Sequence, residues 1–318
     1  MFSSRLRDKL LGTEGFVSLY GTTPPRANAS PARIAAATDK LAARLAQLPI
    51  DGVVVYDVQD EAGRTVEPRP FPFLPTLDSR AYAQQLQQQT GHATIVYKCV
   101  AEMPEAPWRS WLDDSQHTYG VENLSLVGKP ASHVDDHGLT LSQATRMAAA
   151  HPAQFALGGV VIAERHLNGV SEAKRIVRKT QNGCRYFISQ AVYHAATSAR
   201  LLADYAQVCA QENLPPARLV LTFVPVGREK TMEFMRWLGI KITPETTRAI
   251  LGSSTPVSKS IEICCDNLRR ILDQPCAESL ALGINVESIS IHKDEIDASV
   301  DLFHALQEVM HGEYKAMH

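Results

Sequence analysis

The sequence predicts a single-domain (β/α)8 barrel that spans residues 1–318, and two observations support this prediction. First, eight apolar runs rich in Val, Ile, Leu and Phe alternate with helix-like stretches along the 318 residues. Apolar runs that are continuous, with no polar residue at every second position, are typical of parallel strands buried on both faces. Second, no Pro-, Gly- or Ser-rich linker divides the chain. No glycine-rich dinucleotide motif follows the first run, which counts against the alternative, a doubly wound open sheet.

The expected elements follow one another as strand and helix, the order of a barrel. The expected strands are 15–20, 52–57, 93–100, 121–128, 155–163, 184–190, 217–226 and 283–291. The helix-like stretches are 30–47, 78–90, 106–118, 139–150, 170–182, 195–213, 228–238, 244–251, 257–273 and 293–312. Ser30 is a suitable N-cap, and Pro31 suits the first helical position. Residues 1–14 are expected to form a short N-terminal helical extension.

Composition narrows the classes of function. The formal net charge is -2, and nucleic-acid or membrane-surface binding normally needs a basic face. No apolar run approaches the roughly 18 residues that a bilayer span needs, and the first residues lack the apolar core of a signal peptide. The six cysteines form no CxxC pair and are expected to be reduced thiols. We therefore expect a cytoplasmic protein with a small-molecule partner, for which a homo-oligomer remains open.

The active site of such a barrel lies at the carboxyl ends of its strands, so the strand tips are the candidate residues. These are Tyr20 to Thr23, Tyr56, Asp57, Lys98, Cys99, Gly128, Lys129, Glu164, Arg165, His166, Gln190, Pro225, Val226, His292 and Lys293.

Several tips allow two interpretations. Lys129 is either a solvated turn lysine or a cation beside a cofactor, phosphate or carboxylate. Arg165 could clamp a phosphate with two hydrogen bonds, or form a rim ion pair with Glu164. Gln190 could read the donor and acceptor edges of a heterocycle, or cap a neighbouring loop. Lys293 faces the mouth only if the eighth strand ends near Ile291.

One loop carries a metal-like pattern. The stretch "ASHVDDHG" at 131–138 places two histidines four residues apart, a spacing that chelates metals on a helix. Because this stretch reads as a loop after the fourth strand, a polar surface loop is the favoured interpretation and no metal site is predicted.

Several segments, in this order, resemble the methylenetetrahydrofolate reductase family. The clearest are "RKTQNGCRYFISQAVYH" (178–194) and "LTFVPVGREKTMEFMRWLGIKITPE" (221–245). Weaker ones are "GFVSLYGTTPPR" at the first strand, "ENLSLVGKP" at the fourth, "ERH" after the fifth and "VESISIHK" at the last. The similarity runs from about residue 15 to residue 310.

The resemblance implies a flavin-dependent oxidoreductase of one-carbon metabolism. It implies non-covalent FAD at the barrel mouth, NAD(P)H as electron donor and a flat, pterin- or folate-like substrate. Carried over by position, the cofactor would contact Lys98, Gly128, Lys129, Glu164, His166 and Lys179. The substrate would contact Gln190, Glu229 and Lys293, and Tyr20 and Lys129 would be catalytic.

The sequence departs from the family at its acidic residues. The place of the first-strand acid, which serves the family as general acid, falls on Gly21, with Tyr20 beside it. The nearest replacement proton donor would be Tyr20 or a bound water. The place of a fourth-strand aspartate falls on Lys129. These changes keep a second hypothesis open, a non-redox barrel that binds folate or another anion through Lys98, Lys129 and Lys293. It would act in methyl transfer or as a binding partner, and a purely structural or regulatory subunit is the third hypothesis.

Overall fold

In a computed structural model, the eight strands close into one parallel barrel in sequence order, β1 to β8. The structure describes residues 2–317 except 62–64, 101–102, 129–137 and 168–169. The strands are β1 (Val17–Thr22), β2 (Gly52–Val55), β3 (Thr94–Cys99), β4 (Asn123–Val127), β5 (Ala156–Val161), β6 (Tyr186–Ala191), β7 (Arg218–Phe223) and β8 (Leu282–Glu287). The predicted (β/α)8 barrel is confirmed, and all eight expected strands are present.

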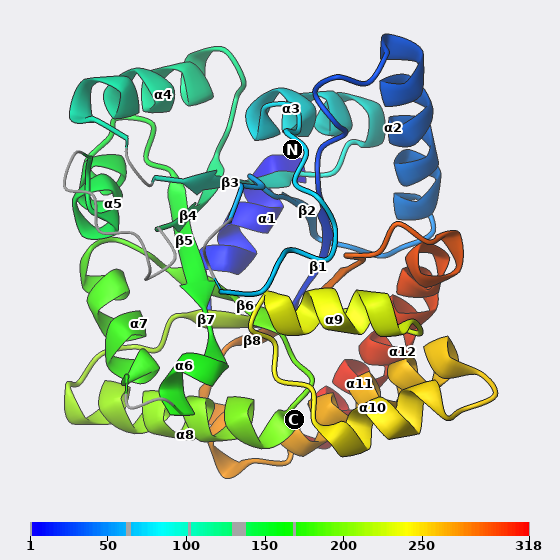
Figure 1. The fold of residues 1–318 in the computed structure, drawn as a ribbon. Coiled ribbons are helices and arrows are strands. Elements are labelled where there is room, and N and C mark those ends of the chain that lie inside the picture. Colours follow the sequence, from blue (N-terminus) through cyan, green and yellow to red (C-terminus); the bar gives the residue numbers. More distant parts are fainter. Residues whose placement is uncertain (1, 62–64, 101–102, 129–137, 168–169, 318) are drawn as a thin grey trace.

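Helices surround the ring of strands (Figure 1). They are α1 (Phe2–Leu11), α2 (Pro31–Leu45), α3 (Ser79–Thr90), α4 (Glu105–His117), α5 (Leu141–Ala149), α6 (Ala163–Leu167), α7 (Glu172–Gln181), α8 (Ala195–Gln211), α9 (Glu229–Trp237), α10 (Pro244–Leu251), α11 (Pro256–Leu272), the 3-10 helix η1 (Pro275–Ser279) and α12 (Lys293–Met317). Ser30 caps α2 as expected, because its side chain accepts a hydrogen bond from the amide of Arg33. The sequence did not predict the short helix α6. No described helix has both the length and the apolar character that a membrane span needs.

The N-terminal helix closes one end of the barrel. Leu6 and Leu10 of α1 are buried in the same apolar cluster as the inward side chains of the strands. On β7, Arg218 donates hydrogen bonds to the carbonyl oxygens of Gly12, Glu14 and Gly15, at 2.9–3.0 Å. Residues 1–14 therefore include a helix as expected, and that helix covers the amino ends of the strands. The mouth is at the opposite, carboxyl end.

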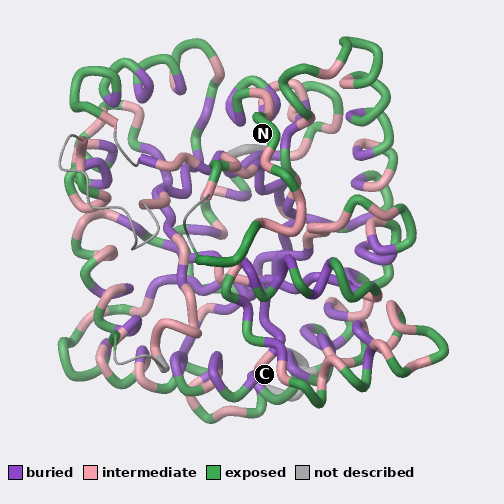
Figure 2. Tube along the Cα trace, viewed as in Figure 1, coloured by how far each residue is buried: buried purple, intermediate pink, exposed green. Residues whose placement is uncertain are grey.

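Two apolar layers hold the fold together, and buried residues fill the middle of the molecule (Figure 2). Alternate strand residues such as Val17, Leu19 and Val54 fill the inside of the barrel. The residues between them, such as Tyr20 and Val53, pack against the helices. None of the six cysteines forms a disulfide, which agrees with the expectation of reduced thiols.

The segment that follows β2 reaches over the mouth to α9, on the far side of the ring (Figure 1). The backbone oxygen of Glu67 accepts a hydrogen bond from Nε1 of Trp237 at 3.1 Å. Phe71 packs edge-on against Phe234, and the Arg69 guanidinium lies over the rings of both Phe234 and Trp237. These aromatic and cation–π contacts join the β2 and β7 sides of the mouth.

Candidate functional site

Polar side chains gather inside the barrel at the mouth, and β8 provides two of them. The inward residues of β8 are Gly283, Asn285 and Glu287, because side chains alternate along a strand. Asn285 donates to the hydroxyl of Tyr56 at 3.1 Å and to that of Thr222 at 3.2 Å. Glu287 is the last residue of β8 and pairs in register with Gly21 of β1. A carboxyl group therefore lies where the barrel opens.

The carboxyl group of Glu287 lies in space that Gly21 leaves empty. A Cβ atom built on Gly21 would stand 2.9 Å from Oε2 of Glu287 and 2.9 Å from Cε2 of Tyr56. Real Cβ atoms essentially never approach other atoms so closely. A glycine at this position therefore allows Glu287 and Tyr56 to occupy the inside of the mouth.

Burial controls the protonation of this group. Burial raises the pKa of Glu287 above its ordinary value, while the neighbouring side chains of Tyr56 and Asn285 lower it by less. Burial also raises the pKa of Tyr56 well above its usual value, and the charge of Glu287 adds to that shift. The tyrosine hydroxyl therefore stays protonated, and the carboxyl group is the one that titrates.

Two tyrosine rings form the wall beside the carboxyl group. The rings of Tyr56 and Tyr97 meet edge-on, with centroids 4.7 Å apart. Ser125 of β4 pairs in register with Tyr97 of β3, and burial raises the pKa of the Tyr97 hydroxyl. We call Tyr56, Tyr97, Ser125, Asn285 and Glu287 the mouth cluster.

The mouth cluster has unused hydrogen-bonding capacity. Oε2 of Glu287, Oδ1 of Asn285 and Oγ of Ser125 are buried and have no hydrogen-bond partner among the described residues. Buried polar atoms are normally paired, so such a group of atoms needs an explanation. Three acceptors beside two aromatic rings suit a flat ligand that carries N–H donors.

Tyr20 lies outside this cluster. It faces the helices, and its hydroxyl is 2.7 Å from Oγ of Ser299 on α12. Its neighbours Leu19 and Gly21 face the inside of the barrel, because adjacent strand residues point to opposite sides. The geometry therefore does not support a role for Tyr20 as a proton donor at the mouth.

Three of the expected cofactor contacts are bound to other parts of the protein. Lys98 lies 3.4 Å from Oδ2 of Asp57 and over the ring of Trp111 on α4. His166 shares a 2.6 Å hydrogen bond with Asp204 of α8. Lys179 donates to the backbone oxygen of Val160 and lies over the ring of Phe187.

The remaining expected cofactor contacts are Gly128, Lys129 and Glu164. Glu164 accepts a hydrogen bond from the amide of Lys241 at 3.3 Å, and burial raises its pKa. Gly128 follows β4 and lies near Leu141. Lys129 and the 131–137 part of the metal-like loop lie outside the described residues.

The three expected substrate contacts lie apart. Gln190, at the end of β6, donates to the backbone oxygen of Leu238 at 2.5 Å, and its Oε1 is buried without a partner among the described residues. Glu229 is exposed at the start of α9. The Lys293 side chain is 92% exposed and lies 3.8 Å from Asp297. Because β8 ends at Glu287 and not near Ile291, Lys293 begins a surface helix and does not face the mouth.

The sequence interpretation included Tyr56 among the strand tips but missed Glu287. That glutamate lay within the expected strand 283–291, so it was not counted as a tip. A signal was present, because Asn285 and Glu287 are polar residues two positions apart in the stretch 282–287, which is otherwise apolar. Such spacing puts both side chains on one face of the strand.

Comparisons with known proteins give a likeness that covers nearly the whole chain. No family model and no curated protein matches the chain. An uncharacterized protein from Clostridium thermocellum, whose structure binds two copies of 5-methyl-5,6,7,8-tetrahydrofolic acid, is 29% identical with a TM-score of 0.80. The similarity covers 98% of this chain and 99% of that one.

Two dihydropteroate synthases are more distant. The enzyme from Xanthomonas albilineans is 14% identical with a TM-score of 0.44, over 93% of this chain and 94% of its own. The one from Thermus thermophilus is 11% identical with a TM-score of 0.48, over 97% of each chain. Such low likenesses carry no argument about ligand or activity. The fold defines the class, a single-domain (β/α)8 barrel, and this chain is similar over its whole length to a barrel that binds a reduced folate.

Proposed function

We propose that this protein binds a reduced folate at the barrel mouth, and that Glu287 recognises the heterocycle. The observation that carries the proposal is the whole-length similarity to the Clostridium thermocellum barrel that binds 5-methyltetrahydrofolate. The proposal keeps the ligand class of the non-redox hypothesis, a barrel that holds a folate or passes on its one-carbon unit. It replaces that hypothesis's binding residues, Lys98, Lys129 and Lys293, with Glu287 and its neighbours.

The chemistry of the mouth cluster supports the proposal. The pyrimidine ring of a reduced pterin has neighbouring N–H donors, and a carboxylate can accept two parallel hydrogen bonds from such a pair. The free Oε2 of Glu287 and the free Oδ1 of Asn285 offer acceptors. The rings of Tyr56 and Tyr97 offer an apolar surface for the body of the heterocycle.

The test is a calorimetric titration of the full chain with 5-methyltetrahydrofolate. Hydrogen bonds to charged groups contribute about 1.5–3 kcal/mol, so Glu287→Gln should weaken binding by about tenfold to a hundredfold. Glu262→Gln is the matched control, because that carboxylate is exposed and paired with Lys259 on α11. The proposal fails if the unmodified protein does not bind the folate, or if both variants bind it equally well.

A flavin-dependent reductase of the methylenetetrahydrofolate reductase type is the second candidate. The motif resemblance of residues 178–194 and 221–245 favours it. The contacts of Lys98, His166 and Lys179 with the protein's own groups count against it. Flavin absorption bands in the purified protein, together with NADH oxidation that depends on methylenetetrahydrofolate, would establish this candidate. A colourless protein that does not quench the fluorescence of added FAD would eliminate it.

A further inference from the structure

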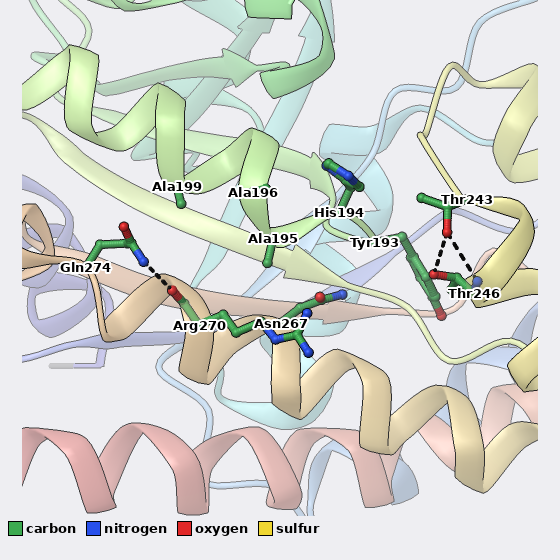
Figure 3. A pocket seen from close by; sticks show the side chains of 10 residues that line it. All are labelled: Tyr193, His194, Ala195, Ala196, Ala199, Thr243, Thr246, Asn267, Arg270 and Gln274. Atoms are coloured by element: carbon green, nitrogen blue, oxygen red, sulfur yellow. Dashed lines mark hydrogen bonds between the residues drawn. The ribbon is translucent and has the colours of Figure 1, made fainter.

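A pocket of about 410 Å³ lies on the flank of the barrel, between helices α8, α10 and α11. Figure 3 shows its walls, in which the first turns of α8 face side chains of α11 and the start of α10 lies at one end. The volume falls within the range of roughly 300–1,000 Å³ that small-molecule sites have. The pocket shares no lining residue with the mouth cluster, so it is a separate feature.

Helix α11 contributes two donors to this pocket. Asn267 is only 6% exposed, and its Nδ2 has no hydrogen-bond partner among the described residues. Arg270 lies three residues further along, on the same face of the helix. Its guanidinium is exposed, and within the described part of the chain no carboxylate lies within ion-pair distance of it. A buried amide donor and a free cation therefore line one wall.

The start of α8 contributes further donors. His194 is its N-cap residue and makes no capping hydrogen bond, because its Nδ1 is 2.6 Å from Oγ1 of Thr197. The amides of Ala195 and Ala196 have no acceptor in the part of the chain that the structure describes. By contrast, the side chain of Thr243 caps α10 by accepting from the amide of Thr246. The open end is therefore that of α8, and unpaired amides at a helix start attract anions.

The charges on the walls of the pocket favour an anion. None of the residues that line the pocket is acidic. Burial lowers the pKa of His194, and the nearby charge of Lys241 lowers it further. Lys241 therefore lies close to the pocket in addition to Arg270, and it also interacts with the carboxyl group of Glu164. None of the lining residues carries a carboxylate that could pair with Arg270.

We propose that this flank pocket is a second ligand site, which binds the oxyanion group of a small molecule. The oxyanion, a carboxylate or a phosphate, is held by Arg270, by Nδ2 of Asn267 and by the first amides of α8. The apolar part of the ligand lies against Ala195 and Ala199. The proposal is independent of folate binding at the mouth.

The test is calorimetry on the full chain with three separate probes: L-glutamate, inorganic phosphate and 5-methyltetrahydrofolate. At least one probe should bind, and Arg270→Gln should weaken that binding tenfold or more. Arg269→Gln is the matched control and should change it less than twofold, because Arg269 pairs with Asp266 at 2.9 Å and does not line the pocket. The probe that responds identifies the source of the oxyanion. The proposal is overturned if no probe binds in a manner that depends on Arg270.

A second variant distinguishes loss of the binding site from loss of folding. Ala196→Glu places a carboxylate in the first turn of α8, where the helix dipole favours it, so the protein should remain folded. The new charge should abolish anion binding by repulsion and by occupying the amide donors. Unchanged binding in this variant also overturns the proposal. A Glu287→Gln variant should keep the flank site intact, so failure at the mouth and failure on the flank are distinguishable.

Discussion

Replacing Gly21 by alanine puts a methyl group into the space that Glu287 and Tyr56 occupy. The new Cβ would stand 2.9 Å from Oε2 of Glu287, 3.0 Å from its Cβ and 2.9 Å from Cε2 of Tyr56. All three distances are well inside van der Waals contact, so the carboxyl group and the ring must both move. Adding a methylene-sized group to a well-packed interior costs about 1–3 kcal/mol. We therefore expect the free energy of unfolding to fall by about that amount.

The same substitution should reduce ligand binding, because it moves the carboxylate away from the ligand. A lost charge-assisted hydrogen bond of about 1.5–3 kcal/mol corresponds to a tenfold to hundredfold weaker affinity for 5-methyltetrahydrofolate. Urea denaturation would measure the stability, and calorimetric titration the affinity. Gly159→Ala is the control, because its Cβ would face the helices and lie 3.3 Å from Cε1 of Phe187. If Gly21→Ala binds the folate as tightly as the unmodified protein, the reasoning is refuted.

Three further predictions concern the protonation of Glu287 and the hydrogen bonds of Glu295 and Tyr20. The raised pKa of Glu287 means that, between its ordinary value and the raised one, the folded protein keeps a proton that the unfolded chain has lost. The free energy of unfolding should therefore fall as the pH rises through that window. Glu287→Gln should flatten this part of the curve of stability against pH. An unchanged curve in that variant would argue against a raised pKa of Glu287. Glu295 is buried and accepts hydrogen bonds from the amides of Gly227 and Arg228 and from the hydroxyl of Thr231, at 2.7–2.9 Å. Glu295→Ala should lower the unfolding free energy by about 3 kcal/mol or more, because each unsatisfied donor costs about 1–3 kcal/mol; a loss below 1 kcal/mol in urea denaturation would contradict this. Tyr20→Phe should cost about 1 kcal/mol by removing one hydrogen bond and leave folate affinity within about twofold, so a large loss of affinity would place Tyr20 at the mouth after all.

The fold could be predicted because its signals are local. Eight apolar runs alternate with helical stretches, and each run became a strand. The first helix after β1 begins where Ser30 and Pro31 indicated. The end of a strand is less visible, because Ile289 and Ile291 continue a strand-like pattern beyond the last paired residue. The run 283–291 therefore hid the end of β8 at Glu287.

The site was harder to predict because it depends on which way each strand residue points. A shift of one residue moves a side chain from the mouth to the helix layer. Tyr20 and Lys98 were both expected at the mouth, yet each contacts a helix outside the barrel. The pairing of Gly21 with Glu287 joins the two ends of the chain through closure of the barrel. No local pattern in the sequence contains that information.

The most direct measurement is a crystal structure of the protein with 5-methyltetrahydrofolate. The proposed function predicts that the pterin ring lies against the wall formed by Tyr56 and Tyr97, with its N–H groups facing the carboxylate of Glu287. A folate bound only elsewhere, with no contact to Glu287, would contradict it.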